Sequence, residues 1–158
     1  MRWNFVDRII KFEPWHNIAA LKAGSLEEYS LMERWGQAGQ APAVLSLESS
    51  VQAARWLVEA SSAFVHSLEL LELEGWAADE GLRPGERLFS DVRLTEKGAD
   101  GRLTFGVRQK RLAPAESCPT QLSPEGGEYQ IKGRLNLLAD KCRPDDRQCL
   151  WHDMASYD

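Results

Sequence analysis

The sequence has little of what several specialised classes of protein require. Its 158 residues include three cysteines and three histidines, and Asp and Glu outnumber Lys and Arg, for a formal net charge of −5. Nucleic-acid binding requires a concentrated excess of basic residues, and a membrane span requires roughly 20 successive apolar residues. The chain has neither, so we expect no nucleic acid and no membrane among its partners.

The cysteines are also too few for a disulfide framework. All three lie in the last third of the chain: Cys118, Cys142 and Cys149. The charged residues Asp7 and Arg8 come too early in the chain for a signal peptide. An odd number of cysteines without a signal peptide indicates reduced thiols in a cytoplasmic protein. Cys142, Cys149 and His152 have none of the usual zinc spacings, so we expect no metal.

What is present is ordinary for a globular protein, with 43% hydrophobic and 27% charged residues. A chain of this length suits one domain with a sizeable core. We expect that domain over residues 1–140, followed by a polar C-terminal tail over 141–158. Three prolines and two glycines between Ala113 and Gly127 predict a surface insertion there.

The clearest periodic pattern predicts an α-helix from Pro42 to about Ser61. Its apolar residues recur at steps of three and four, which places them on one helical face: Val44, Leu47, Val51, Ala54 and Val58. Pro42 fits the first turn, where its missing N–H costs nothing.

Runs of strand-forming residues lie on both sides of this helix. The predicted strands are 5–12, 17–22, 64–76, 86–97, 102–112 and 129–139. Gly98–Gly101 predicts a hairpin turn, and 27–32 predicts one or two turns of a further helix. A hairpin, one long helix and a run of antiparallel strands indicate an α+β fold in which the helix lies across one sheet.

This order is that of the hotdog fold, and three segments resemble the β-hydroxyacyl-carrier-protein dehydratases of type II fatty acid synthesis. Residues 5–14 (FVDRIIKFEP) are similar to the family's opening. Pro42–Ala54 resembles its Pro-Gly-Val-Leu…Glu…Gln-Ala segment at the start of the central helix, and Arg83–Leu88 resembles its Pro-Gly-Asp…Leu segment. The resemblance covers roughly residues 5–139 and implies a long central helix wrapped by an antiparallel sheet.

The resemblance also implies a reaction. The family removes water from a 3-hydroxyacyl thioester on the phosphopantetheine arm of an acyl carrier protein, without a cofactor. A histidine in a Gly-His-Phe loop takes the C2 proton, a carboxylate 14 positions later assists departure of the hydroxyl, and the N–H of the glycine after the proline polarises the carbonyl. Such chemistry requires a base of near-neutral pKa and a donor for the enolate oxygen.

Two of these three positions differ in this chain. Glu48 matches the helix carboxylate, but the residue 14 positions earlier is Arg34, whose guanidinium holds its proton beyond about pH 12 and cannot act as a general base. Ala43 replaces the glycine. The chain alone is therefore expected to be close to inert as a dehydratase. The resemblance places five residues around the substrate: Arg34, Trp35, Ala43, Val44 and Gln52.

The roles of these side chains stay open. Glu48 borders the apolar face of the helix, so it is either the catalytic carboxylate or a half-exposed residue paired with Arg55. Arg34 has as candidate partners a neighbouring carboxylate, a carboxylate across a dimer interface, and a phosphate or acyl oxygen. His16 and His66 are expected to be surface or structural residues rather than proton carriers.

Three functions follow. The first is a subunit of a heterodimeric dehydratase, which contributes Glu48 to a site whose histidine comes from a homologous partner, since the family builds its sites across a dimer interface. The second is a non-catalytic binding or structural module that binds acyl chains or the carrier protein. In general we expect the chain to form a homodimer or a heterodimer with a dehydratase homologue. The third is a hotdog thioesterase that uses Glu48.

The later strands carry a basic bias within this acidic chain. The residues are Arg102, Arg108, Lys110, Arg111, Lys132 and Arg134. They form either a docking surface for an acidic carrier protein or the solvated outer face of a sheet, and we favour the second.

Overall fold

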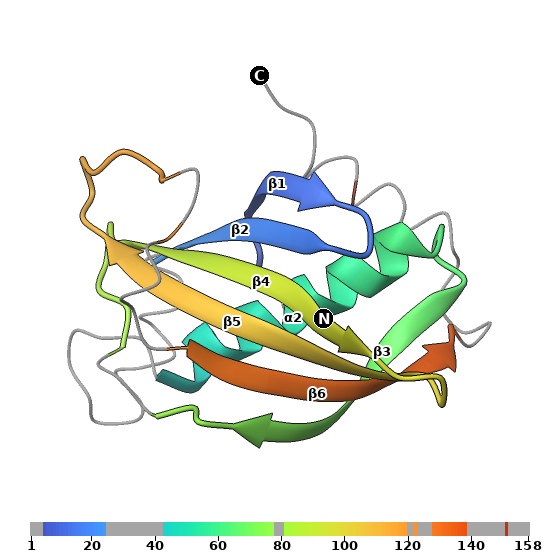
Figure 1. Ribbon diagram of the computed structural model, residues 1–158. Coiled ribbons are helices and arrows are strands. Elements are labelled where there is room, and N and C mark those ends of the chain that lie inside the picture. Colours follow the sequence, from blue (N-terminus) through green and yellow to red (C-terminus); the bar gives the residue numbers. More distant parts are fainter. Residues whose placement is uncertain are drawn as a thin grey trace.

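The computed structural model describes residues 5–24, 43–77, 81–119, 122, 128–138 and 151. In these residues an antiparallel sheet wraps around one long helix (Figure 1). The elements are β1 (Arg8–Glu13), β2 (Asn17–Ala23), α2 (Ala43–Ser61), β3 (His66–Glu74), β4 (Arg87–Lys97), β5 (Arg102–Leu112) and β6 (Glu128–Leu137). The strand order is β1-β2-β4-β5-β6-β3, and every neighbouring pair is antiparallel. The α+β prediction is confirmed.

The helix α2 ends without a glycine. Its C-terminal end is closed by Ser62, whose hydroxyl accepts the backbone N–H of His66 at 3.0 Å. Ala63 and Phe64 then take the left-handed conformation, with φ of 52° and 62°. Residues other than glycine rarely adopt this backbone conformation because it costs energy. Here the Ser62 hydroxyl and the following strand hold the backbone in place. The predicted end near Ser61 is confirmed. The short helix expected over 27–32 lies outside the described residues.

The main core lies between α2 and the inner face of the sheet, the face that the helix covers (Figure 1). Because alternate residues of a strand share a face, each strand contributes every second side chain to this layer. Its fully buried members include Ile18, Val51, Leu57, Val58, Val92, Phe105 and Ile131. Burial of this apolar area is the main favourable term in folding.

One described residue near the C-terminus joins this core. Trp151 makes an edge-to-face contact with Phe12 of β1, with ring centroids 4.8 Å apart, and its ring lies 6.0 Å from that of Trp56 on α2. Trp56 is only 5% exposed. Trp151 therefore packs between β1 and the helix, a contact that no local pattern in the sequence indicates.

A second, smaller cluster lies on the outer face of the sheet, the face turned away from α2. It contains Ala19, Leu21, Phe89, Leu112 and Leu122, with Ile10 and Cys118 packed against it. Leu122 and Cys118 belong to the segment expected as a surface insertion, so the described part of this segment shields apolar residues of the sheet. Burial raises the pKa of the Cys118 thiol, as for a cysteine with a packing role.

The approach of β3 to β6 depends on Gly133. A Cβ atom there would lie 2.5 Å from Leu68 Cδ1 and 2.6 Å from the carbonyl oxygen of Glu69, and the backbone oxygen cannot move without breaking the pairing. We expect Gly133→Ala to lower the free energy of unfolding by about 1–3 kcal/mol. At Gly106 the nearest atom is the flexible end of the Glu128 side chain, so Gly106→Ala should cost less. Urea unfolding of both variants tests this difference, and equal losses would contradict it.

Candidate functional site

The inner face of the sheet changes from apolar to polar along β5. Leu103, Phe105 and Val107 point toward α2 and are fully or almost fully buried. The next two residues of the same alternation are Gln109 and Arg111, at half-buried positions. Strand residues two apart share a face, so a polar amide and a guanidinium occupy inner positions beneath the first half of the helix.

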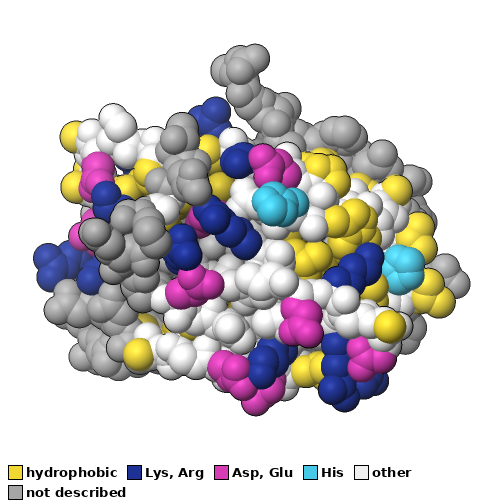
Figure 2. Space-filling model, in the orientation of Figure 1, with side chains coloured by type: hydrophobic (Ala, Val, Ile, Leu, Met, Phe, Trp, Pro, Cys, Tyr) yellow, Lys and Arg dark blue, Asp and Glu magenta, His cyan; other side chains and the backbone are white. Residues whose placement is uncertain are grey.

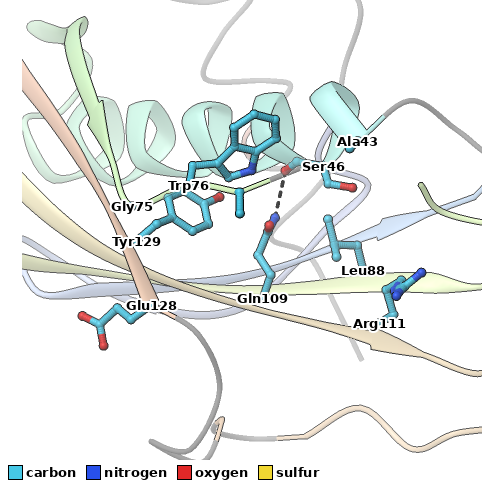
Figure 3. Close-up of a pocket in the computed structure, with 10 residues that line it drawn as sticks. Ala43, Ser46, Gly75, Trp76, Leu88, Gln109, Arg111, Glu128 and Tyr129 are labelled. Carbon is cyan, nitrogen blue, oxygen red and sulfur yellow. Dashed lines mark hydrogen bonds between the residues drawn. The ribbon is translucent and has the colours of Figure 1, made fainter. Parts of the chain in front are cut away.

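Gln109 organises a polar network between the sheet and α2. Its Nε2 lies 2.8 Å from the carbonyl oxygen of Ser46 (Figure 3) and 2.7 Å from the hydroxyl of Ser50. It also lies 3.1 Å from the hydroxyl of Ser90 on β4. A carbonyl only accepts hydrogen bonds, which fixes the amide nitrogen on this side. Three acceptors thus share two hydrogens. Of the two buried serines of α2, Ser50 is bonded to Gln109, whereas the Ser49 hydroxyl has no partner among the described residues.

A partly open cavity of about 280 Å³ lies beside this network. Its walls include Ala43 and Ser46 of α2, Trp76 after β3, and side chains of the inner sheet face: Leu88, Gln109 and Tyr129 (Figure 3). In the close-up, Tyr129 extends from β6 toward the helix, whereas Glu128 points away from it. The cavity therefore lies within one chain, between the start of the helix and the sheet.

Tyr129 lines this cavity, and its hydroxyl oxygen is itself buried. The residue is 8% exposed, and its hydroxyl oxygen makes no hydrogen bond to any described residue. Burial raises the pKa of Tyr129 to about 12, although the nearby Ser50 hydroxyl offsets part of this rise. The phenol is therefore protonated throughout the physiological range.

The raised pKa of Tyr129 predicts a sensitivity to alkali. A tyrosine that ionises near pH 10 in the unfolded chain and near 12 in the folded one stabilises the fold fully below pH 10 and loses that contribution as pH rises toward 12. We expect the Tyr129→Phe variant to lose about 1 kcal/mol less unfolding free energy than the wild type between pH 9 and pH 11. Urea unfolding at both pH values measures this, and identical pH dependence would refute it.

Glu48 lies on a different side of α2. Its side chain is 38% exposed, and its Oε1 lies 3.7 Å from Arg55 Nη1 and 3.4 Å from Gln52 Nε2. The Oε1 of Gln52 accepts the backbone N–H of Phe5 at 2.9 Å. The pairing with Arg55 that the sequence suggested is thus present, and the carboxylate is held in place yet accessible.

The predicted site residues fall into two groups. Val44, Glu48 and Gln52 follow one another at steps of four along one helical side, where Val44 is 53% exposed. Ala43 lines the cavity on another side. Arg34 and Trp35 lie outside the described residues, so the arginine in place of the family's histidine stays a prediction of the sequence.

The two described histidines lie at the far end of the helix from Glu48. The turn that carries His16 is joined to α2 by a hydrogen bond from the Trp15 N–H to Ser61 Oγ of 2.8 Å, and His66 is bonded to Ser62. With a rise of about 1.5 Å per residue, this end is roughly 20 Å from Glu48. In the part of the chain that the structure describes, no imidazole faces this carboxylate.

The basic residues of β5 and β6 are mostly paired on the outer face. Arg108 contacts Glu128 at 2.8 Å, and Lys110 contacts Glu116 at 2.7 Å. Figure 2 shows basic and acidic side chains interspersed rather than a continuous basic patch. This arrangement favours a solvated sheet face. Arg111 differs, because it lines the cavity on the inner side.

Neither a metal site nor a membrane span is found in the described residues. They contain no group of three or more side chains suited to hold a metal ion, and none of their helices is both long and apolar enough to cross a bilayer. Cys142, Cys149 and His152, which the sequence argued against as zinc ligands, lie outside the described residues.

The cavity-lining residues Gln109, Trp76 and Tyr129 were not among the predicted site residues. A signal existed in β5, where the inner positions continue past Val107 with Gln109 and Arg111. Polar residues at inner positions require partners inside the fold. The hydrogen bond between Gln109 and Ser50 became apparent only when the strand and the helix were placed together.

No protein-family model matches the sequence, and the search of curated proteins finds no match either. Solved structures do match in shape. One is the dehydratase heterocomplex ApeI:P from Xenorhabdus doucetiae, with a TM-score of 0.57, 11% identity and coverage of 92% of this chain and 88% of that chain. Another is a putative thioesterase, yhdA, from Lactococcus lactis, with a TM-score of 0.56, 10% identity and coverage of 83% and 94%.

A third is a hot-dog-like protein from Thermanaerovibrio acidaminovorans, with a TM-score of 0.52, 10% identity and coverage of 92% of this chain and 96% of that chain. Identities this low bear on the fold alone, because one fold hosts many chemistries. In the described residues, a six-stranded antiparallel sheet packs around one long helix. The chain has a hotdog-like fold.

Proposed function

We propose that this chain is a subunit of a heterodimeric dehydratase that acts on 3-hydroxyacyl thioesters of an acyl carrier protein. In this proposal Glu48 belongs to a site whose basic histidine comes from a homologous hotdog partner. One observation carries it: Glu48 is an accessible, oriented carboxylate, while both described histidines lie roughly 20 Å away at the other end of α2.

The division of roles follows from the chemistry. The partner's imidazole takes the proton from C2, and the electron pair forms the C2–C3 double bond. The C3 hydroxyl leaves as water with the proton of Glu48, which acts in its protonated, neutral form and is left as the carboxylate. Each such proton transfer contributes roughly 10²- to 10⁴-fold to the rate. Gln52 and Arg55 are positioning residues here, because their contacts fix the orientation of the carboxylate.

The sheet offers a place for a second chain. β3 is an edge strand that pairs only with β6 among the described elements. Exposed apolar residues lie on this edge, on the adjoining end of β6 and just before β3: Leu71, Leu137 and Val65. Unpaired edges with exposed apolar side chains favour association with another strand. A dehydratase heterocomplex among the structures of similar shape is in keeping with this arrangement.

The test is reconstitution. The chain should be co-expressed with a hotdog homologue that retains a Gly-His-Phe loop, and dehydration of a 3-hydroxyacyl-carrier protein should be measured for each protein alone and for the pair. We expect co-purification and activity of the pair, and little or none from this chain alone. Dehydration at full rate by this chain alone would refute the division of roles.

A second candidate is a non-catalytic module that binds acyl chains or the carrier protein. The observation in its favour is the ion pair of Glu48 with Arg55, which gives the carboxylate a structural role without catalysis. Binding to acylated but not to unacylated carrier protein, unchanged in the Glu48→Gln variant and without turnover in any pair, supports this candidate. Thioester hydrolysis by the purified chain instead indicates the third function, a thioesterase.

A further inference from the structure

We infer that the free edge of β3 is a docking surface for the edge strand of a non-identical chain, one that presents lysine or arginine opposite Glu69 and Glu72. The same carboxylates oppose the pairing of two copies of this chain. This surface deepens the proposed function, on which it rests, because it names the chemistry by which the dehydratase partner is recognised. It is tested by association, whereas the proposed function is tested by dehydration.

The edge of β3 offers backbone groups to a further strand. β3 pairs with β6 on one side and forms an edge of the described sheet (Figure 1). The N–H of Leu138 donates to the carbonyl oxygen of Val65 at 2.9 Å. In an antiparallel pair, residues that bond to a neighbouring strand alternate with residues whose backbone groups point away from it. Leu68 and Leu70 therefore turn their N–H and C=O groups toward the free edge.

Three carboxylates lie along the outer face of this edge. The inner face of β3 carries leucines that belong to the main core or pack against it: Leu68, Leu70 and Leu73. Because neighbouring residues of a strand alternate between faces, Glu69, Glu72 and Glu74 lie on the outer face. The alternation shifts by one residue at Leu71, where the register with β6 changes as in a β-bulge.

The basic side chains that face these carboxylates lie on β6, away from the free edge. Lys132 Nζ lies 2.5 Å from Glu74 and 3.4 Å from Glu72, and Arg134 is opposite Glu69 in the register. A strand added at the free edge approaches from the other side of β3. It therefore meets a row of carboxylates before it meets these cations.

Two copies of this chain would bring these carboxylates together. A two-fold axis makes the pairing of two identical edge strands antiparallel, and residues opposite each other must share a face of the sheet. Because of the bulge, two registers match the faces along the whole strand. One places Glu69 opposite Glu72, and the other places Glu69 opposite Glu74. Like charges directly opposite destabilise a strand pair, and the symmetry makes each contact occur twice.

A partner strand with basic residues at these positions turns the same contacts into pairs of opposite charge, which stabilise a strand pair. Leu71, which is 50% exposed, adds apolar contact area in either kind of pair. Apolar burial therefore favours association in general, whereas the charges along the edge decide which partner is accepted.

Reversing one charge tests this logic. In the Glu69→Lys variant both registers place a lysine opposite a carboxylate, so its homodimer should have a dissociation constant roughly tenfold or more below that of the wild type. Sedimentation equilibrium measures this constant, and added NaCl should weaken the variant's dimer by screening. Glu96→Lys is the matched control, because it changes the net charge equally at an exposed position of β4, which is not an edge strand. It should leave self-association unchanged.

A basic-edged copy of the chain serves as the probe for the partner. It carries Glu69→Lys and Glu72→Lys and keeps Glu74 for Lys132. We expect this copy to remain monomeric alone and to form a mixed dimer with the wild-type chain, and urea unfolding shows that each variant is folded.

Three results would overturn the inference: a wild-type homodimer as tight as that of Glu69→Lys, an equal gain in Glu96→Lys, or a basic-edged copy that pairs no better with the wild type than with itself. None of them bears on catalysis. If association follows the charges but no reconstituted pair dehydrates its substrate, the proposed function fails and the docking surface remains.

Discussion

Replacing Glu48 with glutamine in the reconstituted pair is expected to lower the rate of dehydration by roughly 10²- to 10⁴-fold. Glutamine keeps the length of the side chain and the contact with Gln52, but it cannot transfer a proton to the departing hydroxyl. The stability of the chain should change little, because ion pairs as exposed as Glu48–Arg55, at 38% and 39%, contribute about 0–1 kcal/mol.

The matched control for this result is Arg55→Gln. This variant breaks the same ion pair but leaves the carboxylate in place, so it should lower the rate far less. Stopped assays with 3-hydroxyacyl-carrier protein compare the two variants, and urea unfolding shows whether both remain folded. Equal, small effects of both substitutions would assign the pair a structural role and favour the non-catalytic module.

The largest expected effect on stability comes from the layer between α2 and the sheet. Leu103 of β5 is 1% exposed within the main core, and Leu103→Ala should lower the free energy of unfolding by about 2–5 kcal/mol, since it removes buried methyl groups and leaves a cavity. For a domain whose total stability is of order 5–15 kcal/mol, this is a large fraction. Chemical denaturation measures the loss.

Leu137 of β6 provides the control for this substitution. It is also a leucine in a strand, but it is 73% exposed, so Leu137→Ala should change the stability of the isolated chain by no more than about 0.5 kcal/mol. Comparable losses at the two positions would mean that Leu103 is not packed as described. If Leu137 contacts a second chain, its substitution should weaken the pair without destabilising the single chain.

The helix was predictable because its signal is local. Apolar residues at steps of three and four from Val44 to Val58 mark one helical face, and the structure places α2 at Ala43–Ser61. The hairpin at Gly98–Gly101 was predicted for the same reason: two glycines suit a tight turn, and Gly101 has a φ of 79°. In both cases a few successive residues carry the whole signal.

The candidate site was only partly predictable. Glu48 was found through resemblance, and its pairing with Arg55 through helical spacing. The cavity was missed, because its polar centre joins Ser50, Gln109 and Tyr129 from three elements that are far apart in the chain. Likewise, no local pattern indicates that Trp151 packs on Trp56.

By itself, the sequence determined the helix and strands and their order, because the spacing of apolar residues that marks a helix or a strand is a property of neighbouring residues. It also gave the prediction that Arg34, 14 positions before Glu48, stands where the dehydratases that the sequence resembles have histidine. Only the tertiary structure decided which side chains from distant segments contact one another inside the fold. It set both described histidines at the far end of α2 from Glu48, because contacts between distant segments depend on how the helix packs on the sheet.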